Sequence, residues 1–462
     1  MAEIVHLYRY LRRSALDVPD RRLGLETSGG TALAGPAANP TFFTGFLASP
    51  EVAASALAAV ARVAWARYYE PSRSRALDPV VTCNGDRLRF ESFSGCCGVY
   101  ARLDVLSGAL DGEMHDRGTT NVDISEPLRR MLARVGSGDP LHLAVGPGEL
   151  SMATLGGSVV ERKVPLPRRW LRGFAELQVI VAGFEPRAEV SSAEAARFLG
   201  ALPRRSRASG GDWVMPAGRS LRQTAGPAPG AVCLPGPQRL EALVPLLPHA
   251  TRLSVYGPAA TTASPELASA WELELPGMRL VIALSPELRR GFSGEGAAGD
   301  ALAGPDAAGD AELVDVLLAF EPRAEVGELA DRSGLPVRRV RNALTQLATS
   351  GKVGYDLAEA AYFHRELPYD PALVEQASPR LRSARALVES GAVRLRDGLA
   401  IVTVGDHAHR VGFTADGAAF CTCEWWAKYR GSRGSCTHVL AAGLARSGRS
   451  VAGGTRATKA QP

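Results

Sequence analysis

Three cysteines and one histidine near the end of this 462-residue chain constrain its folding more than any other feature. Cys421 and Cys423 form a C-x-C pair, and after twelve intervening residues Cys436 and His438 form a C-x-H pair. Residues at i and i+2 of an extended segment point to the same side, so each pair can present two donors to one ion. Zn²⁺ favours four such sulfur and nitrogen ligands in a tetrahedron. We therefore predict one Zn²⁺ as cofactor, bound by these four side chains.

The flanking residues predict a ββα arrangement around the two pairs. Residues 410–414 and 418–423 indicate a hairpin with its turn at Asp416 and Gly417, and the apolar residues from Val439 onward predict a helix. His407 and His409 would be rival ligands, although side chains on such a strand more often face solvent.

At these residues the sequence resembles the SWIM zinc finger, which has a C-x-C pair, a variable spacer and a C-x-H pair between a strand pair and a helix. All four ligand positions match, and the resemblance spans about residues 400–446. In this part the chain is similar to bacterial proteins of actinobacterial type that carry the finger. The resemblance implies structural zinc and a role in DNA or protein binding, and it implies no catalysis.

Positive charge is concentrated in the same part of the chain. The whole chain has 53 Lys and Arg against 48 Asp and Glu, but residues 371–462 hold thirteen against six, a surplus of seven. Lys428, Arg430 and Arg433 lie between the two ligand pairs, where they would offset the thiolates or contact phosphate. Nearby aromatic side chains would stack on unpaired bases or pack beneath the metal, and these are Trp425, Trp426 and Tyr429.

Residues 311–370 predict a winged-helix-like domain. The predicted elements are helices over 311–320, 326–332 and 337–349, a turn over 333–336, and wing strands over 352–355 and 360–365. On the third helix the outward-facing side chains would enter the DNA major groove, and these are Arg338, Arg339, Arg341, Asn342, Thr345 and Gln346. The alternative is a winged helix that docks proteins or acts as a spacer, and the acidic residues Glu325, Glu328 and Asp331 weaken the DNA interpretation.

A sixteen-residue segment occurs twice in the chain. Residues 175–190 and 311–326 align without a gap and share ten residues, including the unbroken sequence FEPRAEV. Residues 128–145 and 240–255, upstream of the two copies, both predict a helix, a turn and an apolar strand. An ancestral duplication is the simplest explanation, and a short motif used twice is the alternative.

These patterns predict an α+β multidomain protein. The predicted parts are a helical region over 1–78, an α+β domain with the first repeat over 79–202, a linker over 203–237, a small α/β segment over 238–290, a flexible linker over 291–310, the winged-helix-like domain over 311–370, a helical connector over 371–399, the ββα zinc finger over 400–446 and a disordered basic tail over 447–462. The duplicated N-terminal part resembles a sliding-clamp subdomain in its order of elements.

Several classes of protein are excluded by the sequence patterns. There is no apolar run of about 18 residues, as a membrane span requires, and no signal-peptide pattern at Met1, so we expect a cytoplasmic protein without membrane association and with reduced cysteines. Cys96 and Cys97 would be a reactive thiol pair or buried packing residues, and the sequence identifies no base beside them. Nucleotide-binding and hydrolase motifs are lacking, which predicts a protein that is not an enzyme.

Two functions agree with these observations. The first is nucleic-acid binding, DNA in particular, or regulation, through the finger and the third helix of the winged-helix-like domain. The alternative is a protein-interaction adaptor, associated with an AAA+ ATPase of the MoxR type in a stress or defence system. The ATPase partner is implied by the family resemblance alone.

Overall fold

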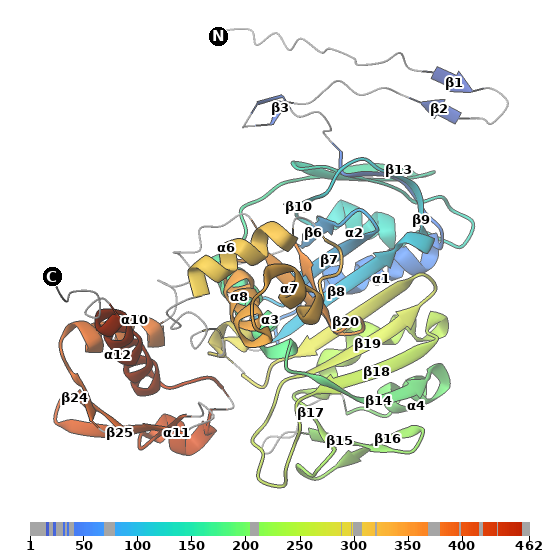
Figure 1. The fold of residues 1–462 in the computed structure, drawn as a ribbon. Helices are drawn as coiled ribbons and strands as arrows, with labels where there is room; N and C mark the ends of the chain where they lie inside the picture. Colours follow the sequence, from blue (N-terminus) through green and yellow to red (C-terminus); the bar gives the residue numbers. More distant parts are fainter. Residues whose placement is uncertain are drawn as a thin grey trace, which may run out of the picture.

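Figure 1 shows a computed structural model of the chain, in which a β-rich body, a helical unit and a C-terminal unit follow one another. The structure describes residues 41–68, 79–203, 212–287, 289–296, 298, 307–318, 321–367, 379–396, 399–414, 419–431 and 433–454. It also contains two short strand pairs, β1 (Ala15–Asp17) with β2 (Arg22–Gly24) and β3 (Thr31–Ala32) with β4 (Gly35–Pro36). Within the described residues, no helix combines the length and the apolar character that a membrane span requires.

The body consists of two halves with a related order of elements, in which a strand, a helix and a group of strands precede a second helix and three more strands. The first half contains β5 (Phe43–Leu47), α1 (Pro50–Trp65), β6 (Val80–Cys83), β7 (Arg87–Phe93), β8 (Val99–Leu106), β9 (Leu110–Met114), β10 (Gly118–Asn121), α2 (Glu126–Leu132), β11 (His142–Val145), β12 (Glu149–Thr154) and β13 (Gly157–Arg162). The second half contains β14 (Glu185–Ser191), α4 (Ser192–Gly200), β15 (Asp212–Ala217), β16 (Ser220–Thr224), β17 (Val232–Leu234), the 3₁₀ helix η2 (Pro237–His249), β18 (Arg252–Gly257), β19 (Ser269–Leu275) and β20 (Met278–Leu284). The related segments 128–145 and 240–255 thus occupy equivalent places, as α2–β11 and η2–β18.

An eight-stranded antiparallel sheet joins the two halves. Its order is β10-β6-β7-β8-β20-β19-β18-β14, so β8 of the first half meets β20 of the second. Their register runs from Val99 opposite Leu284 to Val105 opposite Met278. A five-stranded sheet, β13-β12-β11-β5-β9, and a three-stranded sheet, β16-β15-β17, complete the body. The segments predicted as separate domains over 79–202 and 238–290 therefore share one sheet.

The two faces of the eight-stranded sheet pack against different elements because neighbouring side chains on a strand alternate in direction. Leu103 of β8 and Leu280 of β20 point to the face that packs against Leu57 of α1. Tyr100 of β8 points to the opposite face, where α3 (Arg168–Val181) places Phe174 at a ring-centroid distance of 6.3 Å. The alternating polar residues of the central strands, such as Arg89 and Arg102, are therefore buried on the second face and do not mark a solvent-exposed one.

Two predicted irregular or helical regions contain strands. Residues 43–47, within the predicted helical region over 1–78, form β5, which pairs with β9 and β11. The predicted linker over 203–237 contains β15, β16 and β17, whose Trp213 and Cys233 lie in a small core. Gly218 and Gly230 have positive φ angles of 62° and 82°, so the glycine content of this segment supplies turns between strands.

Residues 307–367 form a helical unit with a terminal hairpin. Its elements are α6 (Ala307–Leu318), α7 (Val326–Ser333), α8 (Val337–Thr349), β21 (Val353–Asp356) and β22 (Ala361–His364). Helix α8 begins and ends at its predicted residues, and Gly334 has a φ of 69° in the turn before it. The spacing predicts that Val337, Val340, Leu344 and Leu347 of α8 face the core; the last three do, whereas Val337 is 42% exposed.

The two copies of the repeated segment differ in structure after their shared helix. In the first copy, α3 is followed by β14, which pairs with β18 at the edge of the large sheet. In the second copy, α6 is followed by an irregular segment in which Ala324 makes a single bridge to Tyr362. The shared residues EPRAE therefore form a strand where a sheet edge is available to them, which shows that tertiary context decides their conformation.

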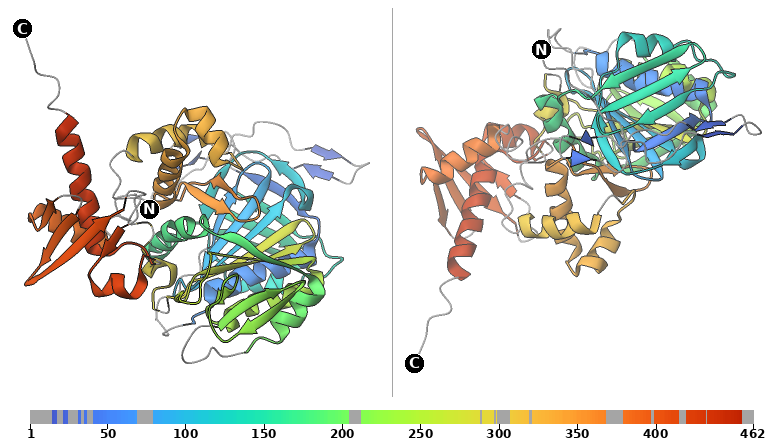
Figure 2. Two further views of the ribbon diagram at one scale, coloured as in Figure 1. Left: turned by 60° about the horizontal axis from the view of Figure 1, so that its bottom comes forward. Right: turned by 90° about the horizontal axis from the view of Figure 1, so that it is seen from above.

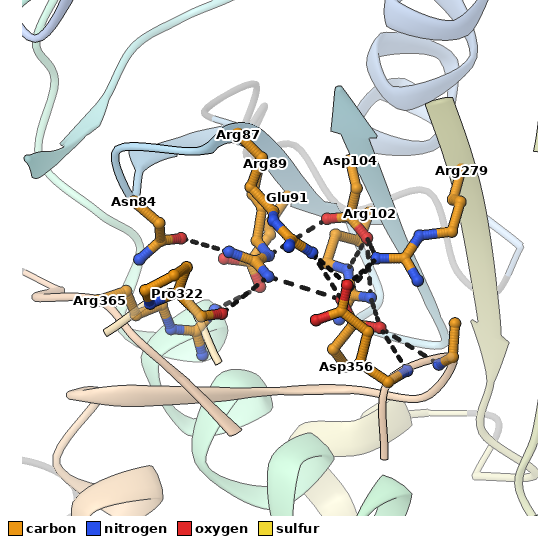
Figure 3. Close-up of polar contacts among 12 residues, drawn as sticks. Asn84, Arg87, Arg89, Glu91, Arg102, Asp104, Arg279, Pro322, Asp356 and Arg365 are labelled. Atoms are coloured by element: carbon orange, nitrogen blue, oxygen red, sulfur yellow. Dashed lines mark hydrogen bonds and ion pairs between the residues drawn. The ribbon is translucent and has the colours of Figure 1, made fainter. Parts of the chain in front are cut away.

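The hairpin β21–β22 packs on the second face of the eight-stranded sheet through a buried ion cluster (Figure 3). The arginines of this cluster belong to the sheet, and the carboxylates belong to both the sheet and the hairpin. The cluster consists of Arg87, Arg89, Arg102, Asp104, Arg279, Asp356 and Glu359. The predicted wing is thus an internal contact between the helical unit and the body.

Asp356 of the hairpin lies at the centre of this cluster. Its carboxylate is 3.2 Å from Arg102 Nη2, 2.8 Å from Arg279 Nη2 and 3.5 Å from Arg89 Nη2. Burial by itself would raise the pKa of Asp356, but the neighbouring arginines outweigh it and hold that pKa well below its usual range. The carboxylate therefore stays ionised and neutralises several buried guanidinium groups at once.

Further contacts hold the second strand of the hairpin. Arg365 pairs with Glu91 of β7, and Tyr100 donates a 2.6 Å hydrogen bond to the same carboxylate. The Arg89 guanidinium carbon lies 3.9 Å from the ring centroid of Phe363, an arrangement that favours a cation–π interaction. The hairpin is therefore held by charge, hydrogen bonds and aromatic packing together.

Replacing Asp356 by asparagine should strongly destabilise the chain. The substitution preserves shape but leaves buried arginines without their shared counter-ion, which costs about 3–5 kcal/mol. Equilibrium urea unfolding should show this loss in the free energy of unfolding. The matched control is Asp331→Asn on the exposed surface of α7, which should change stability by less than about 0.5 kcal/mol. Equal effects of the two substitutions would contradict a central role for Asp356.

Candidate metal centre

The C-terminal unit, residues 379–454, contains a four-stranded antiparallel sheet with helices on one face. Its elements are α10 (Pro379–Glu389), β23 (Val393–Arg396), β24 (Leu399–Val404), β25 (His407–Phe413), β26 (Ala419–Cys421), α11 (Glu424–Tyr429) and α12 (Thr437–Gly454). Val402 and Val411 on one sheet face pack with Val439 and Ala442 of α12. The strands and the helix around the cysteines lie where the sequence predicts them, whereas the segment predicted as a helical connector over 371–399 also contains β23.

Each of the four predicted ligands lies at the end of a regular element. Cys421 ends β26, and Cys423 is the N-cap residue of α11, where its Sγ accepts the backbone N–H of Trp426 at 3.4 Å. Cys436 immediately precedes α12, and its Sγ accepts the N–H of Val439 at 3.4 Å. His438 lies in the first turn of α12. Two helix N-termini thus direct N–H groups at cysteine sulfurs, which favours their thiolate form.

The four ligand atoms lie within 4.8 Å of one another. The separation between Cys421 Sγ and His438 Nδ1 is 3.7 Å, and a tetrahedron with ~2.3 Å Zn–S bonds has edges of about 3.8 Å. The cysteines are buried and His438 is half-buried. Three sulfur donors and one imidazole at this spacing fit Zn²⁺, and the ion would join β26, α11 and α12 in one small unit.

The pKa values of the three thiols shift in different directions. A hydrogen bond with Cys436 lowers the pKa of Cys421, and the same bond together with burial raises the pKa of Cys436 to about 12. Burial raises the pKa of Cys423 as well. A divalent cation at this position would favour the thiolate form of all three sulfurs, so that its binding would release protons.

The two other histidines of this region lie outside the ligand set. The ring of His409 packs on that of His438, with centroids 4.0 Å apart and planes 31° apart. His407 is exposed on the same strand. Among the described residues, the metal-binding group comprises the two predicted pairs alone. His409 therefore supports the orientation of the ligand ring by packing.

The three basic residues predicted to contact nucleic acid near the metal differ in their surroundings. Lys428 is exposed, with its Nζ 5.1 Å from the ring centroid of Tyr429, and Arg430 is also exposed. Arg433 points to the body, where its Nε lies 3.0 Å from Glu295 and its Nη2 pairs with Glu287. Burial by itself would lower the pKa of Arg433, but the carboxylates of Glu295 and Glu287 outweigh it and raise that pKa. Arg433 therefore connects the C-terminal unit to the body.

Sequence reasoning missed Arg380 at the same contact. Arg380 of α10 donates hydrogen bonds to the carbonyl of Glu295 at 2.6 Å and to that of Arg433 at 3.0 Å. Its guanidinium carbon lies 4.3 Å from the ring centroid of Trp425. Trp425 is thereby partly covered by arginines at the edge of the body. A basic residue in the first turn of a helix carries no sequence signal that distinguishes such a contact from a solvent-exposed charge.

Of the α8 residues that were predicted to contact DNA bases, only some are exposed to solvent. Arg338, Arg341 and Asn342 are exposed. Arg339 forms a bidentate ion pair with Asp310, in which its Nη2 and Nε donate hydrogen bonds to the two carboxylate oxygens at 2.6 and 2.7 Å. Gln346 is half-buried. A cavity of about 410 Å³ adjoins this face, with a lining that includes Arg341 and Thr345 of α8, Val179 of α3 with Ala182 just after it, and Tyr355 of the hairpin. Helix α3 therefore covers part of the predicted contact surface.

Cys96 and Cys97 lie in the buried turn between β7 and β8. Cys97 has a positive φ of 56°, and a Cβ placed on Gly291 would lie 2.0 Å from its carbonyl carbon. Cys96 Sγ lies 3.4 Å from Ser94 Oγ. Among the described residues these contacts agree with the packing interpretation of the pair.

No known protein family and no curated protein matches the sequence of this chain. Among solved structures, the proliferating cellular nuclear antigen of Entamoeba histolytica is similar over 54% of this chain and 99% of its own, with 10% identity and a TM-score of 0.35. The PCNA2–PCNA3 complex from Sulfolobus tokodaii is similar over 53% of this chain and 99% of that chain, with 9% identity and a TM-score of 0.37. At these TM-scores, the clamp-like interpretation of the body stays a prediction.

The purified chain should contain close to one zinc per molecule. Replacing Cys421 by serine should lower the metal content severalfold and unfold the C-terminal unit, because four ligands close a structural site. Elemental analysis by mass spectrometry measures the first effect, and limited proteolysis measures the second. The control is Cys233→Ser, a buried cysteine of the body, which should leave zinc content unchanged. A chain without zinc, or unchanged zinc in Cys421→Ser, would contradict the assignment.

Replacing Arg433 by glutamate should separate the C-terminal unit from the body. The new carboxylate would repel Glu287 and Glu295, so small-angle X-ray scattering should show a larger radius of gyration. Lys428→Glu, an equal change of charge at an exposed site, is the control and should leave the radius unchanged. An unchanged radius in Arg433→Glu, with zinc content retained, would show that this contact does not hold the two parts together.

Proposed function

We propose that this chain is a zinc-binding protein that binds nucleic acid through its C-terminal unit, a finger of the SWIM kind. The observation that carries the proposal is the gathering of Cys421, Cys423, Cys436 and His438 within 4.8 Å. Four protein ligands leave no open position for a reacting water, so the ion would organise the fold and not catalyse a reaction. The resemblance to the SWIM finger agrees with such a binding module.

The distribution of charge supports a polyanionic ligand. Residues 371–462 carry a surplus of seven positive charges, whereas residues 1–370 carry a net charge of minus two. Proteins that bind nucleic acid without base readout depend on such local excess, because each neutralised phosphate releases counterions. Lys428 and Arg430 are exposed beside the metal ligands and remain contact candidates. Arg433, which pairs with two carboxylates of the body, is less available.

We interpret the helical unit as a winged helix that uses its wing to dock on the body. Three helices followed by a hairpin are the expected order of elements for such a domain. Since the hairpin is part of the buried ion cluster, DNA contact by this unit would depend on α8 alone. Arg338, Arg341 and Asn342 are exposed there and would supply it. We therefore assign the helical unit a secondary contribution to nucleic-acid binding.

A protein-interaction adaptor is the second candidate function, and helix α6 favours it. Leu313 and Val316 are 42% and 75% exposed on one side of this helix. The aligned residues of the first repeat copy, Leu177 and Ile180, belong to the core on the second face of the large sheet. The same apolar positions are thus covered in one copy and exposed in the other. An ATPase partner for this surface stays a prediction.

Fluorescence anisotropy with the full-length, zinc-loaded chain tests nucleic-acid binding. Affinity for labelled single-stranded and duplex DNA should fall steeply between about 50 and 200 mM salt, because each phosphate contact contributes about 0.7 to 0.9 to the log–log slope. The double substitution Lys428→Gln with Arg430→Gln should weaken binding and make this slope shallower. Absence of binding at low salt, by a chain with full zinc content, would contradict the proposal and leave the adaptor function.

A further inference from the structure

One face of the four-stranded sheet in the C-terminal unit is exposed, while the other packs on α10 and α12. Because side chains alternate along each strand, the burial of Val402, Val411 and Cys421 assigns their neighbours to the outer face. The outward-facing positions are Arg394 and Arg396 of β23, Leu399, Ile401 and Thr403 of β24, Ala408, Arg410 and Gly412 of β25, and Phe420 of β26, with Thr422 after it. In Figure 2 this sheet lies at the edge of the molecule, away from the eight-stranded sheet.

Cross-strand register arranges these residues in two rows. In the first row, Arg396 is opposite Leu399, which is opposite Gly412, which is opposite Phe420. In the second row, Arg394 is opposite Ile401, which is opposite Arg410. Thr422 continues the second row, because its Oγ1 accepts the N–H of Arg410 at 3.0 Å. With strands about 4.8 Å apart, each row spans about 14 Å, so the sheet offers a flat surface long enough for several nucleotides.

Phe420 lies flat across this surface. A Cβ placed on Gly412 would lie 2.0 Å from Phe420 Cε1, so the aromatic ring covers the backbone of the glycine directly. The side chain is nevertheless 45% exposed. One side of the ring therefore packs on the strand, and the other is open to solvent. An open aromatic face held against a sheet is a surface on which an unpaired base can stack.

The charged residues of this face are all cationic. Arg394, Arg396 and Arg410 are exposed, and the outward-facing positions of the sheet include no acidic residue. Within the described part of the chain, none of the three arginines forms an ion pair with a carboxylate. They lie on β23 and β25, so the cationic residues flank Leu399 and Ile401 on β24. A single strand of nucleic acid, with bases that can stack on Phe420 and phosphates that can contact the arginines, has the arrangement that complements this face.

The shape of the face favours a single strand over a duplex. In a duplex the faces of the bases are stacked on one another, so an aromatic ring on a sheet can reach only their edges or the backbone. In a single strand, the base faces are accessible, and aromatic side chains in a basic groove bind them with little dependence on sequence. An acidic protein surface would match the arginines but would leave Phe420 and Leu399 without a stacking or apolar partner.

We infer that the outer face of strands β23 to β26 is a binding surface for single-stranded nucleic acid, with Phe420 as the stacking residue and Arg394, Arg396 and Arg410 as phosphate contacts. This inference rests on the proposed nucleic-acid function and specifies its surface and its ligand. It places the main contact on the opposite side of the sheet from the metal.

The test is anisotropy of the full-length, zinc-loaded chain with labelled oligothymidine and oligouridine of about 20 nucleotides, and with a duplex of equal length. Phe420→Ala and Phe420→Leu should each weaken single-strand binding about tenfold, and the leucine variant retains apolar cover over Gly412. Phe46→Ala is the matched control, because Phe46 lies on a sheet of the body and is also 45% exposed. Zinc content equal to that of the unmodified chain shows that each variant is folded.

The arginines are tested by matched pairs of substitutions. Arg394→Gln with Arg410→Gln should weaken binding and lower the salt slope by about 1.4, as two lost phosphate contacts on a single strand predict. Arg338→Gln with Arg341→Gln, an equal loss of charge on α8, should have a smaller effect. Relative affinity for the thymidine and uridine strands identifies DNA or RNA as the preferred form.

Each outcome separates this inference from the proposed function. Strand binding that is unaffected by Phe420→Leu and by the Arg394 and Arg410 pair would overturn the inference, while the proposed function would stand. Preference for the duplex, lost in the α8 pair, would overturn both, because it would place the contact on α8 and outside the C-terminal unit. Failure to bind any of the three oligonucleotides would overturn both.

Discussion

The ion pairs between Asp356 and the arginines of the eight-stranded sheet determine which surfaces of this chain can meet a partner. Asp356 lies within 3.5 Å of Arg89, Arg102 and Arg279, all of which are largely buried. A charge buried in this way cannot leave its counter-ions without a large cost in free energy. The hairpin therefore stays on the body, and the helical unit cannot use it as a free wing. Of the surfaces predicted to bind nucleic acid, the C-terminal unit and the exposed residues Arg338, Arg341 and Asn342 of α8 remain open.

A metal ion bound by the four ligands would have a comparable role within the C-terminal unit. The apolar core around the ligands is small, and three of its buried members are the cysteines themselves. Metal ligation would therefore supply much of the stability of this unit, since the apolar area buried around the ligands is limited. Holding Cys421 fixes the end of β26 and with it the neighbouring Phe420. Zinc on one side of the sheet would thus position the aromatic ring on the other side.

The sequence predicts local features of this protein well and long-range contacts poorly. The ligand set, the bounds of α8 and the turn at Gly334 follow from spacing and local conformational preference, and the structure contains all of them. The burial of the arginine cluster could not be predicted, because Asp356 lies far along the chain from the arginines of β7, β8 and β20 that it neutralises, and sequence alone does not distinguish buried from exposed arginines. The strands over 212–234 were not predicted, because the glycine-rich turns between them made the segment resemble a linker. A signal for β23 did exist, since Val393 to Arg396 alternates between apolar and basic residues.

Photo-crosslinking tests the central claim most directly. The full-length, zinc-loaded chain is irradiated with oligothymidine bound, and the crosslinked residues are identified by mass spectrometry. A thymine stacked on Phe420 is in contact with its ring, so the account predicts a crosslink at Phe420, on the outer face of the sheet. Crosslinks confined to α8, or to Trp425 and Tyr429 on the side of the metal, would contradict it.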